Sequence, residues 1–138
     1  MNQRWDWDAA AGKFGAKRDG RFNAGGVPIT HPSAIVWRRE TGRDEIFSGD
    51  TIQRRSRRVA NALRRGGVRP GDRVAGLMGR RPGAFIVPLA VWRLGAIYVP
   101  LFSGFRRDAL SVRIKDAGVT AIVTDSANRG GLAGIEAD

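Results

Sequence analysis

The sequence has no cysteine, one histidine and only three lysines among its 138 residues. Without cysteine, the chain cannot carry a disulfide framework, a thiolate zinc site or a cysteine nucleophile. Long apolar runs are missing as well, because the longest, from Gly83 to Trp92, is about half of what a bilayer span needs. The opening residues MNQRWDWDAA hold no apolar stretch typical of a signal peptide. These absences predict a cytoplasmic protein with no membrane span.

The motifs that usually carry catalysis or phosphate binding are also missing. The single histidine, His31, falls in a predicted surface loop, and no G-x-S-x-G nucleophile elbow exists. Neither a G-x-x-x-x-G-K-S/T loop nor a G-x-G-x-x-G turn follows a predicted strand, and Gly76 is expected to allow close packing of a helix on its strand. We predict no catalytic residue and no metal site, because the carboxylates lie mainly where capping accounts for them: Asp44, Glu45, Asp50, Asp72, Asp108 and Asp116.

The charge is strongly unbalanced, at +11 near neutral pH, with 21 arginines. Over residues 52–65 a helical period places Ile52, Val59, Ala60 and Leu63 on one side. That pattern is typical of a solvated amphipathic helix, and it also fits a small basic module that binds a polyanion or a partner protein. No helix-turn-helix, RNP-like or zinc-finger spacing appears, so we expect no specific nucleic-acid binding. The arginines of this segment fall mainly on the opposite side: Arg54, Arg57, Arg58, Arg64 and Arg65.

The composition favours a single folded domain. Apolar residues make up 42% and charged residues 27%, close to globular averages. Residues 1–30 are rich in Gly, Asp and Arg without a sustained period, and we expect an extended or poorly ordered lead-in there. Residues 31–138 carry the regular elements and form the predicted domain.

Strands and helices alternate along that domain. Such alternation implies parallel strands joined by helical crossovers, which is a layered α/β fold. The helix between Pro82 and Gly95 is apolar on all sides, so we expect it to be buried, with Pro88 kinking it or making its first turn irregular. The last three strands are apolar enough to be buried on both faces. The predicted elements are a hairpin of strands 34–37 and 45–47, a helix capped by Ser48 and ending before Gly66, and then strand 73–78, helix 82–95, strand 96–101, helix 107–116 and strand 119–123.

One segment could bind an anion. Residues 124–131 pass from the last strand toward a possible helix start, where free backbone N–H groups and Arg129 would suit a phosphate. A capping turn with a solvent-exposed arginine explains the same residues. Both interpretations remain open on these residues alone.

Several short motifs lie along the predicted domain: Asn61-Ala62-Leu63, residues 67–74 (GVRPGDRV), residues 92–96 (WRLGA), residues 98–102 (YVPLF) and residues 123–125 (VTD). Together they resemble the N-terminal region of the AMP-forming acyl-CoA synthetases, in the adenylate-forming ligase superfamily. The F-x-G-F of residues 102–105, followed by a helix with Arg113-Ile114, is closest to the acetyl/propionyl-type synthetases. The resemblance covers about residues 31–131, and it implies that residues 31–138 form the N-terminal part of the large AMP-binding domain.

This resemblance implies an activity for the full-length family. Its members join a carboxylate to ATP, release pyrophosphate, and pass the acyl group to coenzyme A, with Mg2+ neutralising phosphate charge. The Pro-Lys-Gly loop, the acidic ATP-binding segment and the catalytic lysine of the family have no counterpart in this sequence. By the same resemblance, Arg129, Gly130 and Gly131 occupy the place of a segment whose arginine contacts the nucleotide portion of coenzyme A.

Two hypotheses follow for the function of the chain. The first is an N-terminal fragment of an acyl-CoA synthetase that is inactive alone and that self-associates or binds a C-terminal partner fragment. The second is the basic module described above. The first rests on the resemblance, and the second rests on charge alone.

Overall fold

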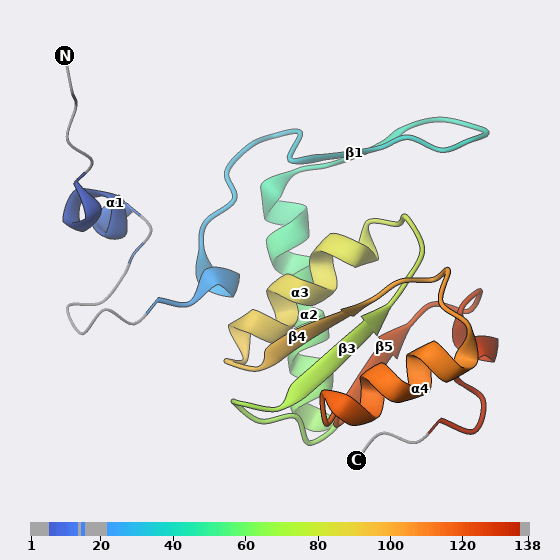
Figure 1. The fold of residues 1–138 in the computed structure, drawn as a ribbon. Helices are drawn as coiled ribbons and strands as arrows, with labels where there is room; N and C mark the ends of the chain where they lie inside the picture. Colours follow the sequence, from blue (N-terminus) through green and yellow to red (C-terminus); the bar gives the residue numbers. More distant parts are fainter. Residues whose placement is uncertain (1–5, 14, 16–21, 136–138) are drawn as a thin grey trace.

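The computed structural model describes residues 6–13, 15 and 22–135 of the chain, so part of the expected lead-in over residues 1–30 lies outside the described residues. Two 3-10 turns, η1 (Ala24–Gly26) and η2 (Arg129–Leu132), join the regular elements. The helix α1 was not predicted, and it lies apart from the sheet in Figure 1. The helices are α1 (Trp7–Lys13), α2 (Gly49–Arg65), α3 (Gly83–Arg93) and α4 (Arg107–Asp116), and the strands are β1 (Ile35–Trp37), β2 (Glu45–Phe47), β3 (Arg73–Leu77), β4 (Ile97–Leu101) and β5 (Ala121–Thr124).

A parallel sheet of three strands in the order β4-β3-β5 forms the centre of the fold. Its register pairs Val74 with Tyr98 on one side and with Ala121 on the other. The predicted α/β fold with parallel strands and helical crossovers is therefore confirmed. Burial on both faces holds for the central strand β3, where Val74, Ala75 and Leu77 are at most 1% exposed. It does not hold for β4 and β5, which are edge strands and only partly buried.

Helices cover both faces of this sheet (Figure 1). On one face, Leu110 and Ile114 of α4 pack with Ala75 and Leu77 of β3. On the other face, α3 packs on β3, and α2 lies against α3. Because β3 leads into α3 and β4 leads into α4, the connections after these neighbouring strands run to opposite faces. In the order β4-β3-β5 the first strand of the sheet, β3, lies between the second and the third, and a sheet of this order has its topological switch point between the first and the third, β3 and β5.

Three helices end in the same way. Gly67, Gly95 and Gly118 each adopt a positive φ just beyond α2, α3 and α4. The next residue then donates its N–H to a carbonyl five residues earlier: Val68 to Leu63, Ala96 to Val91 and Val119 to Ile114, at 3.0–3.1 Å. This is the Schellman arrangement, in which the apolar residue after glycine is buried against the helix. It sets where each following strand enters the core.

The hairpin and α2 match the sequence predictions. Strand β1 pairs antiparallel with β2, and the Trp37 indole donates to the Arg80 carbonyl at 2.9 Å, which fastens the hairpin to the loop after β3. The Ser48 hydroxyl caps α2 by accepting the Thr51 N–H at 3.3 Å. The arginines of α2 are exposed, and Ile52 and Ala60 are buried, as the helical period indicates.

The apolar helix α3 departs from its prediction in one respect. Ile86, Val87, Ala90 and Val91 are buried, but Phe85 is 62% exposed and Trp92 is 42% exposed. The prediction of all-round burial was wrong because α2 and the sheet cover only part of its circumference. The helix runs through Pro88 to Arg93, and the irregularity lies in its first turn, where the Pro82 carbonyl accepts N–H groups from both Phe85 and Ile86.

Residues 22–31 run across α2 and α3. The Asn23 amide donates to the Arg93 carbonyl at 3.2 Å, and the Gly49 N–H donates to the His31 carbonyl at 2.9 Å. At Gly25 a Cβ would overlap backbone atoms of α3, and at Gly49 it would overlap the Ile29 carbonyl. Glycine is therefore required for this close approach.

Candidate functional site

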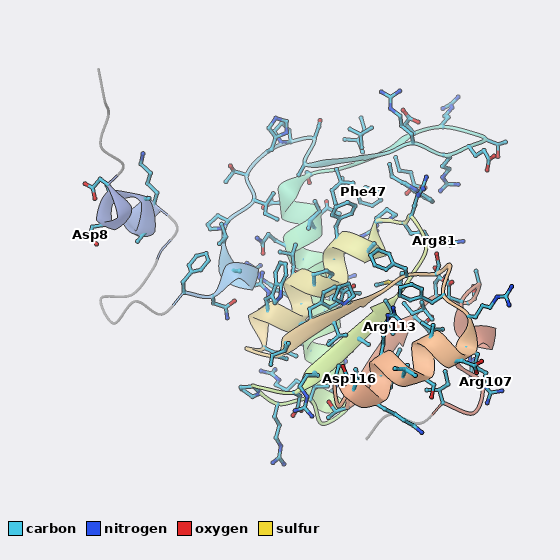
Figure 2. The ribbon with its side chains drawn as sticks, viewed as in Figure 1. Asp8, Phe47, Arg81, Arg107, Arg113 and Asp116 are labelled. Atoms are coloured by element: carbon cyan, nitrogen blue, oxygen red, sulfur yellow. The ribbon has the colours of Figure 1, made fainter. Side chains whose placement is uncertain are left out.

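The carboxyl edge of the sheet is the candidate functional site, because ligands of open α/β sheets bind outside the strand ends at a switch point. A hollow of about 690 Å³ lies there between the loop after β3 (residues 78–82), the loop after β4 (residues 102–104) and the hairpin strand β1. Phe102 is 67% exposed at this edge, and its ring meets Phe105 edge-on at 5.5 Å. Arg81 projects from the loop after β3 (Figure 2).

Asp125, directly after β5, joins the loops at this edge. One carboxylate oxygen accepts the Gly79 N–H at 3.1 Å and faces the Arg81 Nε at 3.7 Å. The other accepts from the Asn128 N–H at 3.0 Å and the Asn128 side-chain amide at 2.7 Å. A single carboxylate therefore ties the loop after β3 to the turn after β5. Next to it, the Thr124 hydroxyl donates to the Leu77 carbonyl at 2.8 Å.

These donors also set the ionisation of Asp125. The hydrogen bond from the Asn128 side chain, followed by that from the Gly79 N–H, holds the pKa of Asp125 below its ordinary value. Partial burial acts in the opposite direction, and Arg81 adds a smaller attraction. The charged form is favoured because every neighbour donates to it or carries positive charge.

Arg129, Gly130 and Gly131 lie in η2, beyond β5, where Arg129 is exposed. The Arg129 N–H donates to the Asp125 carbonyl, and the Gly131 N–H donates to the Asn128 carbonyl, both at 3.1 Å. The expectation that free N–H groups gather in residues 124–131 holds in part, because the N–H groups of Ser126, Ala127 and Gly130 have no acceptor in the described part of the chain. The segment forms the capping turn of the second interpretation. It borders a shallow hollow of about 830 Å³ against β5, beside Ser126.

The other candidate residues are placed as the sequence indicates. His31 is exposed in a loop, and its Nδ1 accepts the Ser33 N–H at 3.0 Å. Asp72 accepts the Arg69 N–H at 2.7 Å, and Asp50 lies 3.7 Å from Arg54. Across the residues with described positions, no three histidine or acidic side chains gather as a metal site would require.

Sequence reasoning missed two polar contacts in the structure. The link from Asp125 to Gly79 spans 46 positions, and no local motif announces it. The second is a buried group on α2, where Gln53 and Ser56 face Arg93 of α3. Helical spacing could have found it, because Gln53 and Ser56 share the inward side with Ile52 and Ala60.

The prediction for Gly76 was wrong. The Tyr98 ring, not a helix, occupies the space above Gly76, and burial raises the pKa of Tyr98.

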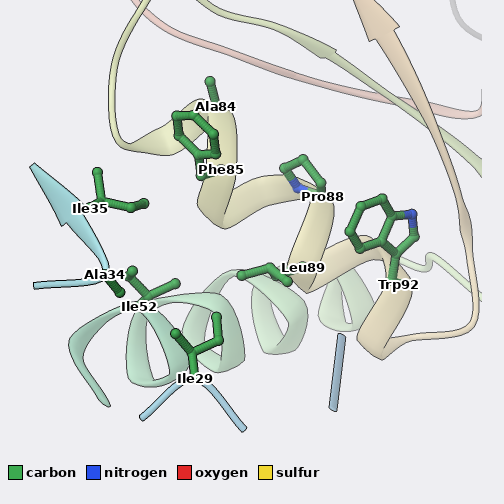
Figure 3. A pocket seen from close by; sticks show the side chains of 9 residues that line it. All are labelled: Ile29, Ala34, Ile35, Ile52, Ala84, Phe85, Pro88, Leu89 and Trp92. Carbon is green, nitrogen blue, oxygen red and sulfur yellow. The ribbon is translucent and has the colours of Figure 1, made fainter. Parts of the chain in front are cut away.

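A third hollow, of about 300 Å³, lies between α3, the start of α2 and residues 29–35 (Figure 3). Phe85 and Trp92 stand two helical turns apart along it, with Pro88 and Leu89 between them. Every side chain that lines this hollow is apolar, so it can offer contact area but few polar anchors. The remaining lining residues are Ile29, Ala34, Ile35, Ile52 and Ala84.

Comparison with known proteins assigns the family. Residues 28–137 match the family model described as "AMP-binding enzyme", so the chain belongs to the AMP-binding enzyme family. It is 30% identical over 137 residues to the acetyl-coenzyme A synthetase of Chlorobaculum tepidum, a match covering 92% of this chain and 21% of that protein. It is 40% identical over 97 residues to the 3-hydroxypropionyl-coenzyme A synthetase of Sulfurisphaera tokodaii, covering 70% of this chain and 15% of that protein.

Solved structures agree with this assignment. The acyl-CoA synthetase of Brucella canis superposes with a TM-score of 0.65 at 38% identity, covering 68% of this chain and 17% of that one. Apo MatB from Rhodopseudomonas palustris superposes with the same TM-score at 30% identity, covering 91% of this chain and 22% of that one. The chain therefore spans about a fifth of the length of the relatives it matches. None of the helices with described positions has the length and apolarity needed to cross a membrane.

Proposed function

We propose that this chain supplies the N-terminal part of the large domain of an AMP-dependent acyl-CoA synthetase. The reaction joins a carboxylate, ATP and coenzyme A to give acyl-CoA, AMP and pyrophosphate. The observation that carries the proposal is the family match over residues 28–137, together with acetyl- and acyl-CoA synthetases among the relatives. A cytoplasmic location belongs to this proposal and can be checked by cell fractionation.

The described residues fit some of the reaction components and not others. Arg129 is exposed beside the 830 Å³ hollow that runs along β5, where its guanidinium can meet a phosphate of coenzyme A, and Gly130 offers its N–H. Magnesium finds no comparable set of ligands, because no acidic cluster occurs in the part of the chain that the structure describes. No step through the metal is therefore assigned to these residues. For ATP, the sequence contains no phosphate-binding loop motif.

It follows from the proposal that the chain alone does not form an acyl-adenylate. Catalysis needs donors directed at the developing phosphate charge, and the family segments that provide them have no counterpart in the sequence. Pyrophosphate exchange with acetate, propionate and medium-length carboxylates should stay at background for the isolated chain. Exchange above background would refute this part of the proposal.

A chimera tests the role of Arg129. Residues 28–131 replace the matching segment of the Chlorobaculum tepidum synthetase, and both half-reactions are then measured. We expect Arg129→Ala to raise the KM for coenzyme A about ten-fold, as loss of one charge-assisted hydrogen bond implies, while pyrophosphate exchange stays unchanged. Arg106→Ala, at another exposed arginine, is the matched control. An unchanged KM would reduce Arg129 to a surface residue.

We further propose that a later part of the synthetase domain, or a C-terminal partner fragment, covers the apolar side of α3. The exposed rings of Phe85 and Trp92 and the 53% exposed Ile97 on the edge strand β4 support this. Without that cover, the isolated chain should self-associate as salt screens its charge of +11.

Sedimentation across a salt series tests this expectation. Oligomers should grow from low to high salt in the wild-type chain, and Phe85→Ser with Trp92→Ser should reduce them. Val112→Ser, which removes an equally exposed apolar side chain from α4, should not. A compact monomer at every salt concentration would show that α3 needs no cover.

A further inference from the structure

The outer side of α2 carries positive charge with little to balance it. Six arginines of this helix are exposed, and its one acidic residue, Asp50, lies 3.7 Å from Arg54. Arg54 also donates to the Thr51 hydroxyl at 3.1 Å. Arg57 has no hydrogen bond or ion pair to any described residue. Like charges three and four positions apart destabilise a helix, so the row of arginines lowers the stability of α2.

A second positive charge, on Arg93, lies near enough to Arg57 to feel its charge. The Arg93 guanidinium, from the end of α3, donates to the side-chain amide oxygen Oε1 of Gln53 and approaches the Ser56 hydroxyl at 3.5 Å. Its Nε is buried and has no acceptor in the described structure. The Arg93 side chain is partly exposed, and the acceptors that its guanidinium reaches are all neutral. Burial, and then the nearby charge of Arg57, lower the pKa of Arg93.

A hollow of about 380 Å³ opens beside Arg57, and Gln53 separates it from Arg93. It lies between α2 and the segment 26–30, and Gln53, Arg54 and Arg57 line it. Gln53 is held in place because its amide nitrogen donates to the Val27 carbonyl while its oxygen accepts from Arg93. Since one water in the liquid occupies about 30 Å³, the hollow has room for a tetrahedral oxyanion and several waters. Asp50 also lines the hollow, and its carboxylate lies 3.7 Å from the Arg54 guanidinium.

We propose that this hollow binds a phosphate group, with the Arg57 guanidinium as its main ligand and Arg93 supplying attraction from behind Gln53. A dianionic oxyanion would balance the two charges that no described carboxylate neutralises. Arginine suits this role because its forked donors match phosphate oxygens. The site is independent of the carboxyl edge and of the proposed ligase reaction, since α2 and the segment 26–30 contribute none of the strand ends.

Calorimetric titration with inorganic phosphate at constant ionic strength tests the proposal. We expect saturable binding to the wild-type chain and an affinity about ten-fold weaker in Arg57→Gln, the loss expected for one charge-assisted hydrogen bond. Arg65→Gln is the matched control, because it removes the same charge from the same helix eight residues away from the hollow. It should change the affinity less than about two-fold if general electrostatics contribute little.

Thermal unfolding gives an independent readout, because a ligand of the native state alone raises the Tm. Phosphate should raise the Tm of wild type and of Arg65→Gln above that in sodium chloride of equal ionic strength, and it should raise the Tm of Arg57→Gln by clearly less. Titration with glycerol phosphate separates a preference for the free ion from one for a phosphomonoester. Binding no stronger than that of chloride, or equal losses in Arg57→Gln and Arg65→Gln, would overturn the proposal.

Discussion

Asp125→Ala is expected to destabilise the fold more than any other single change at the carboxyl edge. The substitution removes an acceptor that three N–H groups share, those of Gly79 and Asn128 and the Asn128 side chain. It also removes the partner of Arg81. The loop after β3 and the turn after β5 are then no longer joined by a side chain.

The magnitude follows from the geometry of these bonds. A hydrogen bond to a charged group contributes about 1.5–3 kcal/mol, but bonds to one carboxylate are not additive, and water can reach donors near the surface. Asp125 is 16% exposed and Arg81 is 56% exposed, so the ion pair adds little. We expect the free energy of unfolding to fall by about 2–3 kcal/mol, which corresponds to a Tm lower by about 8–12 °C in a domain of this size.

The pH dependence of the effect identifies its cause. The pKa of Asp125 is depressed in the folded state, so its contribution is fully present above the unfolded value of about 3.9 and is lost as pH falls through the folded pKa. The difference in stability between wild type and Asp125→Ala should therefore be constant near neutral pH and shrink only below about pH 4.

Urea unfolding at pH 7 and at pH 3.5 measures both quantities. Asp125→Asn is the informative companion, because its amide nitrogen would face the donors of Gly79 or Asn128 and should recover little of the lost stability. A loss below about 1 kcal/mol, or a difference that does not shrink in acid, would show that the carboxylate is not what joins these loops.

Two further changes test packing at other places in the fold. Gly49→Ala should cost about 3 kcal/mol in urea unfolding, because its Cβ would overlap the backbone carbonyl of Ile29, whereas Gly104→Ala, with open space around it, should be near neutral. Leu110→Ala should cost about 3 kcal/mol, since Leu110 is 2% exposed in the core under α4, while Val112→Ala on the same helix, at 65% exposure, should cost less than about 0.5 kcal/mol. Equal losses within either pair would contradict the packing described above.

Local signals predicted most of the fold. The bounds of α4 match the predicted residues 107–116, and the layered parallel sheet follows from the alternation of elements. One error in the element bounds lies at the junction between a helix and the strand that follows it. Strand β5 begins at Ala121 and not at Val119, because the Val119 N–H still closes the end of α4 by bonding to Ile114. A valine after glycine is typical of both a strand start and a Schellman end, so the residue type could not separate them.

The candidate site was less predictable than the fold. The sequence places Arg129, Gly130 and Gly131 after the last strand, but it cannot show that the N–H groups of Arg129 and Gly131 already bond to the Asp125 and Asn128 carbonyls. Side chains that meet across distant segments, such as Asp125 with Gly79 or Gln53 with Arg93, depend on strand order and helix packing. These relations exist only once the sheet has formed, so no periodicity along the chain reports them.

The distribution of charge supports the proposal that α3 has a partner. Although the chain has 21 arginines, α3 carries one charged residue, Arg93, and that side chain turns toward α2. The outer side of α3 therefore presents Phe85 and Trp92 without a nearby charge from its own helix, while α2 exposes six arginines. A solvent-facing helix in so basic a protein would be expected to carry charge on its outer side, as α2 does. Its absence from α3 indicates a surface that is suited to contact with apolar side chains and not to water.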